Sequence, residues 1–503
     1  MPPWVLLAGI ATIAGLDLIA LSGGALTIPA LVAIFALLVA GIHRLESARL
    51  PRVETADWPE ESTPMVWPLD YAIAGAIGAG NFALSFIGYW RPDGASCWTL
   101  GRLSHCGIFD ELYFARAGEE YLLNLRIYEN THPPLSKLLV TLSMLLFGGM
   151  PGGDNPHGWR FLDVVFGALA VVVLYAFAKR VTGSTLFASI AAILLSLDGM
   201  HFVQSRIATP EGFAVVFATF ATYAFYRFVM EVQAGGASRL WLVLFSIALG
   251  CLVSTKWYGV MGFGVSFVVL AGLYLRRPHS FRLARTLAAI VCVSAAVYTF
   301  SWVPDLVRNS PDPNEIHSFG DVLNRQKQMF DYHDTLRATH PYSSKWWEWP
   351  LDDVPVAYFY DDRRTNKQDP NGCCVLEITS LPNPVVLWFG LFSVPFVGWL
   401  AIARRNIGCS LIVLTYLMQW LPWMGSPRIT FAYHFYDDIP LICLCNAIAL
   451  QNVRRLSGLV SAAYVALAGI AFVFFYPILS AHAVTWNAWH ARMWLPTWII
   501  GPG

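Results

Sequence analysis

The chain has 503 residues, of which 56% are hydrophobic and only 13% are charged, a balance that excludes an ordinary soluble domain and predicts a membrane protein. Its 33 Lys and Arg residues equal its 33 Asp and Glu residues, so the net charge indicates neither nucleic acid nor an acidic partner. Only the placement of these charges can then be informative.

Mostly apolar segments of about 17 to 22 residues predict thirteen membrane-spanning helices. They lie at residues 3–21, 25–42, 69–89, 160–178, 184–200, 211–230, 240–256, 258–275, 286–303, 385–403, 408–424, 436–450 and 457–476. The joints on one side of these spans carry Arg44, Arg49, Arg52, Lys179, Arg180, Arg227, Arg239, Arg276, Arg277, Arg282, Arg285, Arg404, Arg405, Arg454 and Arg455. The positive-inside rule places that side in the cytoplasm, so we expect a cytoplasmic N-terminus and an external C-terminus.

Two apolar runs need a separate interpretation. Residues 1–21 carry no Lys or Arg before their apolar run, unlike a cleaved signal peptide, and are interpreted as a span. Residues 138–147 are too short to cross and are predicted to form an interfacial helix on the outer side. Two extended external regions remain, residues 90–159 and 304–384, and functional residues are expected there. The sequence contains no GxGxxG or Walker motif for cytoplasmic nucleotide chemistry.

The nine cysteines do not form a zinc-binding pattern, because no CxxC pairs with a second CxxC. Cys97 and Cys106 share the first external region, where an oxidising compartment permits a disulfide but does not require one.

The first external region places Asp110 beside Glu111, followed by Arg116. Adjacent helical residues point about 100° apart, so both carboxylates cannot address one atom, and one of them is expected to serve structure or Arg116. A hydrated acidic helix start is the alternative. Further along, two prolines after His132 fix an extended backbone that can hold this side chain beside a site, although Pro also begins many helices for conformational reasons alone.

Ionisable residues recur at the outer ends of the predicted spans. They are Arg160, Asp163, Asp198, His201, Arg206, Glu211, Lys256, Arg428, His434, Asp437 and Asp438. Charges beside spans usually face a cavity or one another, and the surplus of cations, which are Arg160, Arg206, Lys256 and Arg428, suits a lipid-anchored phosphate. Snorkelling of single side chains at helix ends is the alternative.

These elements, in this order and spacing, resemble the bacterial protein O-mannosyltransferases, the polyprenyl-phosphate-mannose-dependent members of the C-type glycosyltransferase fold. The resemblance runs from about residue 69 to 450 and rests on Phe109-Asp110-Glu111-Leu112-Tyr113-Phe114-Ala115-Arg116, His132-Pro133-Pro134-Leu135-Ser136-Lys137, Gly158-Trp159-Arg160, Leu197-Asp198-Gly199-Met200-His201-Phe202, Ser205-Arg206, Ser254-Thr255-Lys256-Trp257, His340-Pro341-Tyr342-Ser343-Ser344-Lys345-Trp346-Trp347 and Asn383-Pro384. Two departures are Ser136, where a glycine is expected, and Pro210-Glu211, where the family commonly has Leu-Asp.

The resemblance implies an all-α polytopic membrane protein with an eleven-span core and two added N-terminal spans. It divides the chain into residues 1–67 (two extra spans and a cytoplasmic linker), 68–480 (the membrane core with both external regions) and 481–503 (an external tail). It further implies that Asp110 is the catalytic base, that Glu111 supports the site, and that Arg160 matches an arginine important to the site. We expect the donor phosphate and substrate to be bound among His132, Lys137, Arg160, Arg206, Lys256 and Arg428.

The implied reaction is transfer of mannose from polyprenyl-phosphate-mannose to Ser or Thr hydroxyls of secreted or membrane proteins, at the periplasmic or extracellular face of the plasma membrane. A polyprenyl phosphate leaves as a stabilised anion, so one base and several cations suffice for an inverting displacement. No metal and no cofactor is expected, and the lipid bilayer rather than nucleic acid is the implied environment.

Alternatives remain open at the sequence level. A transferase of the same fold acting on a lipid or glycan acceptor is the nearest. A transporter is disfavoured because no inverted repeat or pair of broken helices is recognisable, and a catalytically inactive partner subunit is disfavoured by the retention of Asp110 and Glu111. Trp346, Trp347 and Trp349 suit either stacking on substrate or anchoring at the membrane interface.

Overall fold

The computed structural model describes residues 64–92, 94, 96–100, 103–148, 156–236, 239–276, 281–308, 310, 312, 315–362, 372–453 and 457–499. The predicted spans at residues 3–21 and 25–42 lie outside these residues, as does nearly all of the predicted N-terminal unit 1–67.

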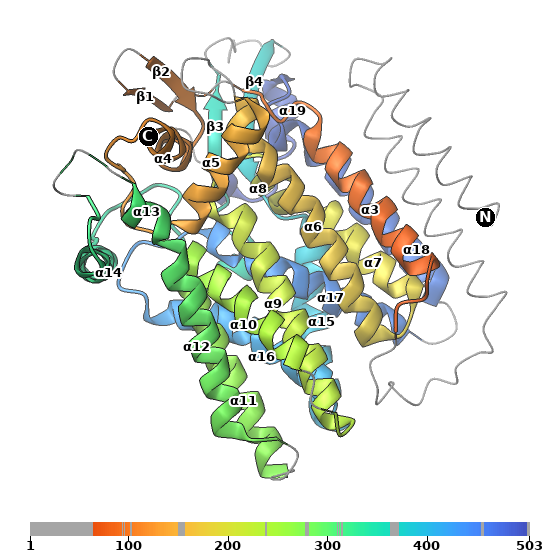
Figure 1. The fold of residues 1–503 in the computed structure, drawn as a ribbon. Coiled ribbons are helices and arrows are strands. Elements are labelled where there is room, and N and C mark those ends of the chain that lie inside the picture. The colour runs from red at the N-terminus through yellow and green to blue at the C-terminus, as the bar shows by residue number, and fades with distance from the viewer. Residues whose placement is uncertain are drawn as a thin grey trace.

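Long apolar helices form the body of the molecule (Figure 1). In chain order they are α3 (Leu69–Phe86), α6 (Pro156–Thr182), α7 (Thr185–Ser196), α9 (Pro210–Gln233), α10 (Arg239–Thr255), α11 (Met261–Arg276), α12 (Leu283–Ser301), α15 (Pro384–Ala403), α16 (Ile407–Trp420), α17 (Ile439–Gln451) and α18 (Ser457–Leu479). Each of the eleven spans predicted between residues 69 and 476 overlaps one of these helices. Seven helical segments of the described chain are long and apolar enough to cross a membrane: 156–182, 210–233, 257–276, 283–307, 384–403, 407–425 and 458–479. The chain is therefore a multi-pass membrane protein, while the total of thirteen spans stays a prediction.

The centre of the bundle is α7, every residue of which is buried, packed against α6 and α17. This helix ends earlier than predicted, at Ser196, because Asp198 caps the next helix, α8 (Gly199–Gln204), by accepting a hydrogen bond from the His201 backbone N–H over 2.9 Å. The other oxygen of Asp198 accepts from the Asn383 N–H over 2.8 Å. Asp198 therefore joins the start of α15 to the core.

The regions predicted to be external hold short helices and strands that gather at one end of the bundle (Figure 1). The first contains β1 (Ser96–Leu100), β2 (Leu103–Gly107), α4 (Glu111–Leu122) and α5 (Leu135–Phe147), and the later ones contain α13 (Val303–Val307), α14 (Phe319–Thr335), β3 (Val356–Asp361), β4 (Cys373–Ser380), β5 (Val484–Thr485) and α19 (Trp486–His490). Five 3₁₀ helices complete the described elements: η1 (Trp257–Val260), η2 (Trp349–Leu351), η3 (Leu421–Gly425), η4 (Ala432–Asp438) and η5 (Pro496–Trp498). The chain is thus mostly rather than entirely helical.

The strands arise where the sequence alternates between inward and outward side chains. In β1, Trp98 and Leu100 are buried while their neighbours are more exposed. Strands β1 and β2 pair antiparallel with Cys97 opposite Cys106, and these two residues form the disulfide that the sequence permitted. The hairpin is attached to α4 because Trp98 donates to the Glu119 carboxylate over 2.7 Å. A second sheet has the order β3-β4-β5.

The helix predicted at residues 138–147 is present as α5, which packs against α4 and α6. It begins after Pro134 and ends at Gly148, whose φ of 77° is the left-handed conformation that glycine adopts without a steric penalty. Its interfacial position stays a prediction.

Candidate active site

Asp110 stands in the turn between β2 and α4, directly after a residue with an uncommon backbone conformation. Phe109 has a φ of 48°, which is unfavourable for a bulky side chain. Its ring stacks on Tyr358 of β3 with centroids 4.1 Å apart and meets Tyr433 of η4 edge-on at 5.7 Å. Aromatic packing from two distant segments therefore holds the turn that presents Asp110.

The carboxylate of Asp110 has no hydrogen-bond or ion-pair partner within the described part of the chain, and its side chain does not cap α4. Burial raises the pKa of Asp110 to about 7; the charge of Glu211 adds to the rise, while Lys256 and Arg428 oppose it. A carboxylate with this pKa is a stronger base than an exposed one and is still largely ionised just above neutral pH.

Glu111 is held in the opposite way. Its carboxylate accepts from Arg160 Nε over 2.6 Å and from Arg160 Nη2 over 2.7 Å, and both side chains are completely buried. The backbone N–H groups of Ile108 and Ala208 add hydrogen bonds of 2.9 and 3.1 Å. A Cβ at Gly107 would lie 2.7 Å from the Glu111 Cβ, so this close approach requires glycine. Glu111 thereby connects α4 to α6 and to the segment before α9.

A second buried ion pair fixes the loop after α4. Lys137 donates to the Glu129 carboxylate over 2.8 Å and to the carbonyls of Glu129 and His132 over 2.8 and 2.9 Å. His132 Nδ1 lies 3.0 Å from the same carboxylate. Although burial opposes ionisation, Lys137 and His132 hold the pKa of Glu129 well below its ordinary value. Lys137 therefore supports the loop that carries His132.

A cavity of about 300 Å³ opens beside this loop. It is lined by His132, Lys256, Trp257, Tyr258, Phe330, His333, Asp334, Trp423, Ser426, Pro427, Arg428 and His434. Three of the residues predicted to bind the donor, His132, Lys256 and Arg428, thus come together although up to 296 positions separate them in the chain. Lys256 and Arg428 act on the pKa of Asp110, and Lys256 approaches Tyr433, whose ring meets that of Phe109 beside Asp110.

The cations of this cavity are held by other side chains. Lys256 pairs with Glu211 at the start of α9, and its Nζ lies 5.7 Å from the centre of the Tyr433 ring. Arg428 contacts Nδ1 of His333, whose Nε2 donates to the Thr131 carbonyl over 2.9 Å. Burial, with the charges of His132 and Arg428, lowers the pKa of His333 to about 4, so this imidazole is neutral at physiological pH and accepts from the Arg428 guanidinium.

Arg160 and Arg206 lie outside the cavity, as do Asp110, Glu111 and Lys137. Arg160 is paired with Glu111, and its Nη1 donates to the Tyr89 carbonyl over 2.9 Å. Arg206 donates to the Ile87 carbonyl over 2.9 Å and lies 4.5 Å from the centre of the Phe202 ring. Neither lines the 300 Å³ cavity.

Sequence reasoning missed Glu129 and His333. Glu129 precedes His132 by three residues, a spacing at which side chains interact on a helical turn, and this spacing could have drawn attention to it. No local pattern singled out His333. Its partners Thr131 and Arg428 are 202 and 95 positions away in the chain.

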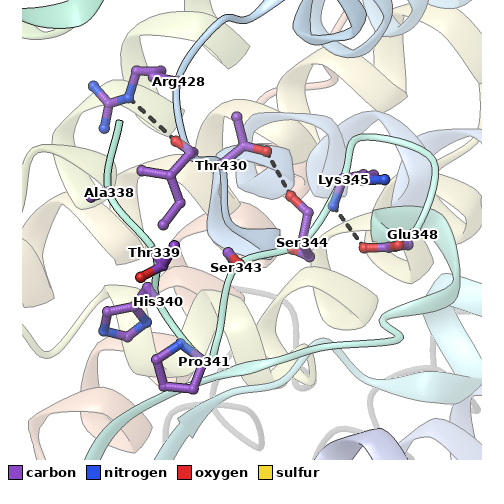
Figure 2. A pocket seen from close by; sticks show the side chains of 11 residues that line it. Ala338, Thr339, His340, Pro341, Ser343, Ser344, Lys345, Glu348, Arg428 and Thr430 are labelled. Atoms are coloured by element: carbon purple, nitrogen blue, oxygen red, sulfur yellow. Dashed lines mark hydrogen bonds between the residues drawn. The ribbon is translucent and has the colours of Figure 1, made fainter. Parts of the chain in front are cut away.

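A larger cavity, of about 610 Å³, also has Arg428 in its lining (Figure 2). It is lined by Ala338, Thr339, His340, Pro341, Ser343, Ser344, Lys345, Glu348, Arg428, Ile429 and Thr430. Arg428 is therefore common to both cavities. Within the described residues no group of three His, Cys, Asp or Glu side chains has the arrangement of a metal site, and metal independence stays a prediction.

Comparison with known proteins matches two family models to the chain. Residues 95–304 match the dolichyl-phosphate-mannose-protein mannosyltransferase family, and residues 318–498 match the C-terminal four-helix membrane region of protein O-mannosyltransferases. The polyprenol-phosphate-mannose–protein mannosyltransferase of Mycolicibacterium smegmatis is 30% identical, over 86% of this chain and 95% of its own length. The protein of the same name from Mycobacterium tuberculosis is 27% identical, over 79% and 88%.

Solved structures share the fold at low sequence identity. A chain of the Saccharomyces cerevisiae protein O-mannosyltransferase Pmt1–Pmt2 complex bound to the sugar donor superposes with a TM-score of 0.68 at 14% identity, over 87% of this chain and 94% of that one. Apo ArnT from Cupriavidus metallidurans gives 0.51 at 14% identity, over 79% and 75%. These likenesses confirm the predicted class of membrane glycosyltransferase fold.

Proposed function

Because this chain belongs to the dolichyl-phosphate-mannose–protein mannosyltransferase family, we propose that it transfers mannose from a polyprenyl-phosphate donor to Ser or Thr hydroxyls of proteins, with Asp110 as the base. The observation that carries this proposal is the contrast between the acidic residues of the site. Glu111, Glu129 and Glu211 each have a cationic partner, whereas Asp110 has none among the described residues.

The reaction is a direct displacement at the anomeric carbon of the sugar. The acceptor oxygen forms a bond to this carbon as its proton passes to the Asp110 carboxylate. The bond from the carbon to the phosphate oxygen breaks, and its electron pair leaves with the polyprenyl phosphate. Because the phosphate departs as an anion, no acid has to protonate it, and the carbon is inverted.

The 300 Å³ cavity suits the donor phosphate. Its lining includes the cationic groups of Arg428 and of Lys256, which is paired with Glu211, and the imidazole of His132. Such preorganised charges stabilise the leaving phosphate as negative charge develops on it. Arg160 and Glu111, by contrast, act as positioning residues, because their donors and acceptors are directed at each other and at the backbone around Asp110.

The placement of the site supports an external active centre. Helix α6 runs for 27 residues, about 40 Å, with Arg160 in its second turn near Glu111 and with Lys179 and Arg180 in its last turn. The site therefore lies at the end of the bundle opposite to this cationic joint, and the positive-inside rule assigns that joint to the cytoplasm.

The test is an assay of purified protein in detergent with polyprenyl-phosphate-mannose and a Ser/Thr-containing peptide, read by mass spectrometry. Wild type should form mannosyl-peptide, and Asp110→Asn should lose roughly 10²- to 10⁴-fold in kcat, the usual contribution of a general base. Asp331→Asn, an exposed position of α14, is the matched control and should retain full activity.

Two results would overturn the proposal. Full activity of Asp110→Asn would remove this residue as the base. If folded wild type consumes the donor yet modifies only a lipid or glycan, the protein acceptor is wrong and the lipid or glycan alternative is right.

A further inference from the structure

The 610 Å³ cavity is built from two segments that the fold joins firmly. The Ser344 N–H donates to the Thr430 carbonyl over 2.9 Å, and the Thr430 hydroxyl donates to the Ser344 carbonyl over 2.6 Å. Figure 2 shows the bond from the Thr430 hydroxyl, with residues 338–348 on one wall and residues 428–430 on the other. We name this feature the acceptor groove, and define it by these two segments.

We propose that the acceptor groove binds the protein substrate as an extended peptide and delivers its Ser or Thr hydroxyl past Arg428 toward Asp110. This inference rests on the proposed function and adds to it the place and the chemical class of the acceptor.

The lining suits a peptide. Thr339, Ser343 and Thr430 contribute hydroxyls, and His340 contributes an imidazole. Lys345 and Glu348 lie together at the end away from Arg428 in Figure 2, where the Lys345 backbone N–H donates to the Glu348 carboxylate over 2.7 Å. The lining thus combines apolar surface with hydrogen-bonding groups, and peptide amides and carbonyls would find partners among the latter.

The backbone of one wall is also open to a peptide. Residues 336–340 form no helix or strand, and the N–H groups of Ala338 and Thr339 donate no hydrogen bond to any other described residue. Both residues are exposed. An extended ligand can pair with such a segment as an added strand does, so that main-chain bonds supply affinity with little dependence on sequence.

The groove reaches the reacting groups through Arg428. This residue borders the acceptor groove and the donor cavity, and its contact with His333 fixes it between them. Asp110 follows Phe109, whose ring meets Tyr433 three positions beyond Thr430, and the charge of Arg428 acts on Asp110, so the proposed base lies toward the same junction. A hydroxyl that extends from the groove at Arg428 would thus approach the donor from the side of the base.

The experiment has two parts. In the first, Thr339→Trp and Ser343→Trp place bulky side chains at exposed wall positions of the groove. Each should raise KM for the acceptor peptide about tenfold or more, equivalent to a loss of about 1.4 kcal/mol in binding, with KM for the donor nearly unchanged. Ser104→Trp, an exposed position of the β1–β2 hairpin that lines neither cavity, is the matched control and should leave both constants as in wild type.

The second part uses the unaltered protein. An acceptor peptide with a benzophenone two residues from its Ser or Thr is irradiated with the enzyme, and the cross-linked residues are mapped by mass spectrometry. Cross-links within residues 338–348 or 428–430 that excess unlabelled peptide suppresses would support the groove.

The outcomes separate the two proposals. Active wild type with unchanged peptide KM in both Trp variants, or competable cross-links only elsewhere, would overturn the acceptor groove and leave the proposed function intact. Wild type that turns over donor but modifies no peptide would overturn the proposed function and the groove with it.

Discussion

Replacing Arg160 by Met should destabilise the protein and slow transfer, with little change in KM for the donor. Arg160 donates to the Glu111 carboxylate over 2.6 and 2.7 Å, and both side chains are fully buried. Removing one partner of a buried pair leaves an uncompensated charge and costs about 3–5 kcal/mol. At about 2.1 cal/mol/K per residue, 503 residues give an unfolding entropy near 1 kcal/mol/K, so the Tm should fall by roughly 3–5 °C.

The assay is thermal unfolding of the purified protein in one detergent, followed by tryptophan fluorescence, together with donor KM and kcat. Arg180→Met, at the other end of α6, is the matched control and should shift the Tm much less. The double variant Glu111→Gln/Arg160→Met should be less destabilised than the sum of the single variants, because it leaves no isolated charge. An unchanged Tm with a donor KM raised tenfold would refute the reasoning and make Arg160 a phosphate ligand.

Three further predictions concern the reaction. The base must be ionised, and with a pKa of about 7 for Asp110 kcat/KM should rise between pH 6 and 8 as the ionised fraction grows from about one-tenth to nine-tenths; a profile flat over this range would contradict the assignment. Lys256→Met in a Glu211→Gln background, which leaves no unpaired carboxylate, should raise donor KM about 10- to 100-fold through loss of one charge-assisted bond; Glu211→Gln alone is the control. Transfer should persist in EDTA, because Lys256 and Arg428 supply the charge that a metal would otherwise provide; a loss of transfer that Mg²⁺ or Mn²⁺ restores would contradict it.

Hydropathy predicted the helical body well because a bilayer requires long apolar segments whatever they pack against. It could not predict β1–β2 or β3–β4, since short strands in external regions depend on partners elsewhere, such as Glu119 beneath Trp98. It also placed the end of α7 too late, because the cap formed by Asp198 interrupts an otherwise apolar run.

Candidate site residues could be predicted where ionisable side chains recur at one level of the membrane. Lys256 and Arg428 carry this signal and line one cavity together with His132, which was predicted from the two prolines that follow it. Arg160 and Arg206 have the same signal in sequence, but their partners are a buried carboxylate and backbone carbonyls. A cationic side chain can bind a phosphate only if other groups of the protein do not occupy it. These groups lie tens to hundreds of residues away in the chain, so local sequence does not reveal them.

Distant contacts also give different surroundings to the two adjacent carboxylates at the start of α4. The sequence required Asp110 and Glu111 to point apart, and the structure directs Glu111 into a buried pair while the turn at Phe109 presents Asp110. A positive φ at a bulky residue costs roughly 1–3 kcal/mol and persists only where its surroundings enforce it. Here the enforcement comes from Tyr358 and Tyr433, more than 240 residues along the chain. The proposed base is therefore correctly placed only when β3 and η4 have packed against the β2–α4 turn, so the two halves of the chain that match separate family models would act together in the proposed reaction.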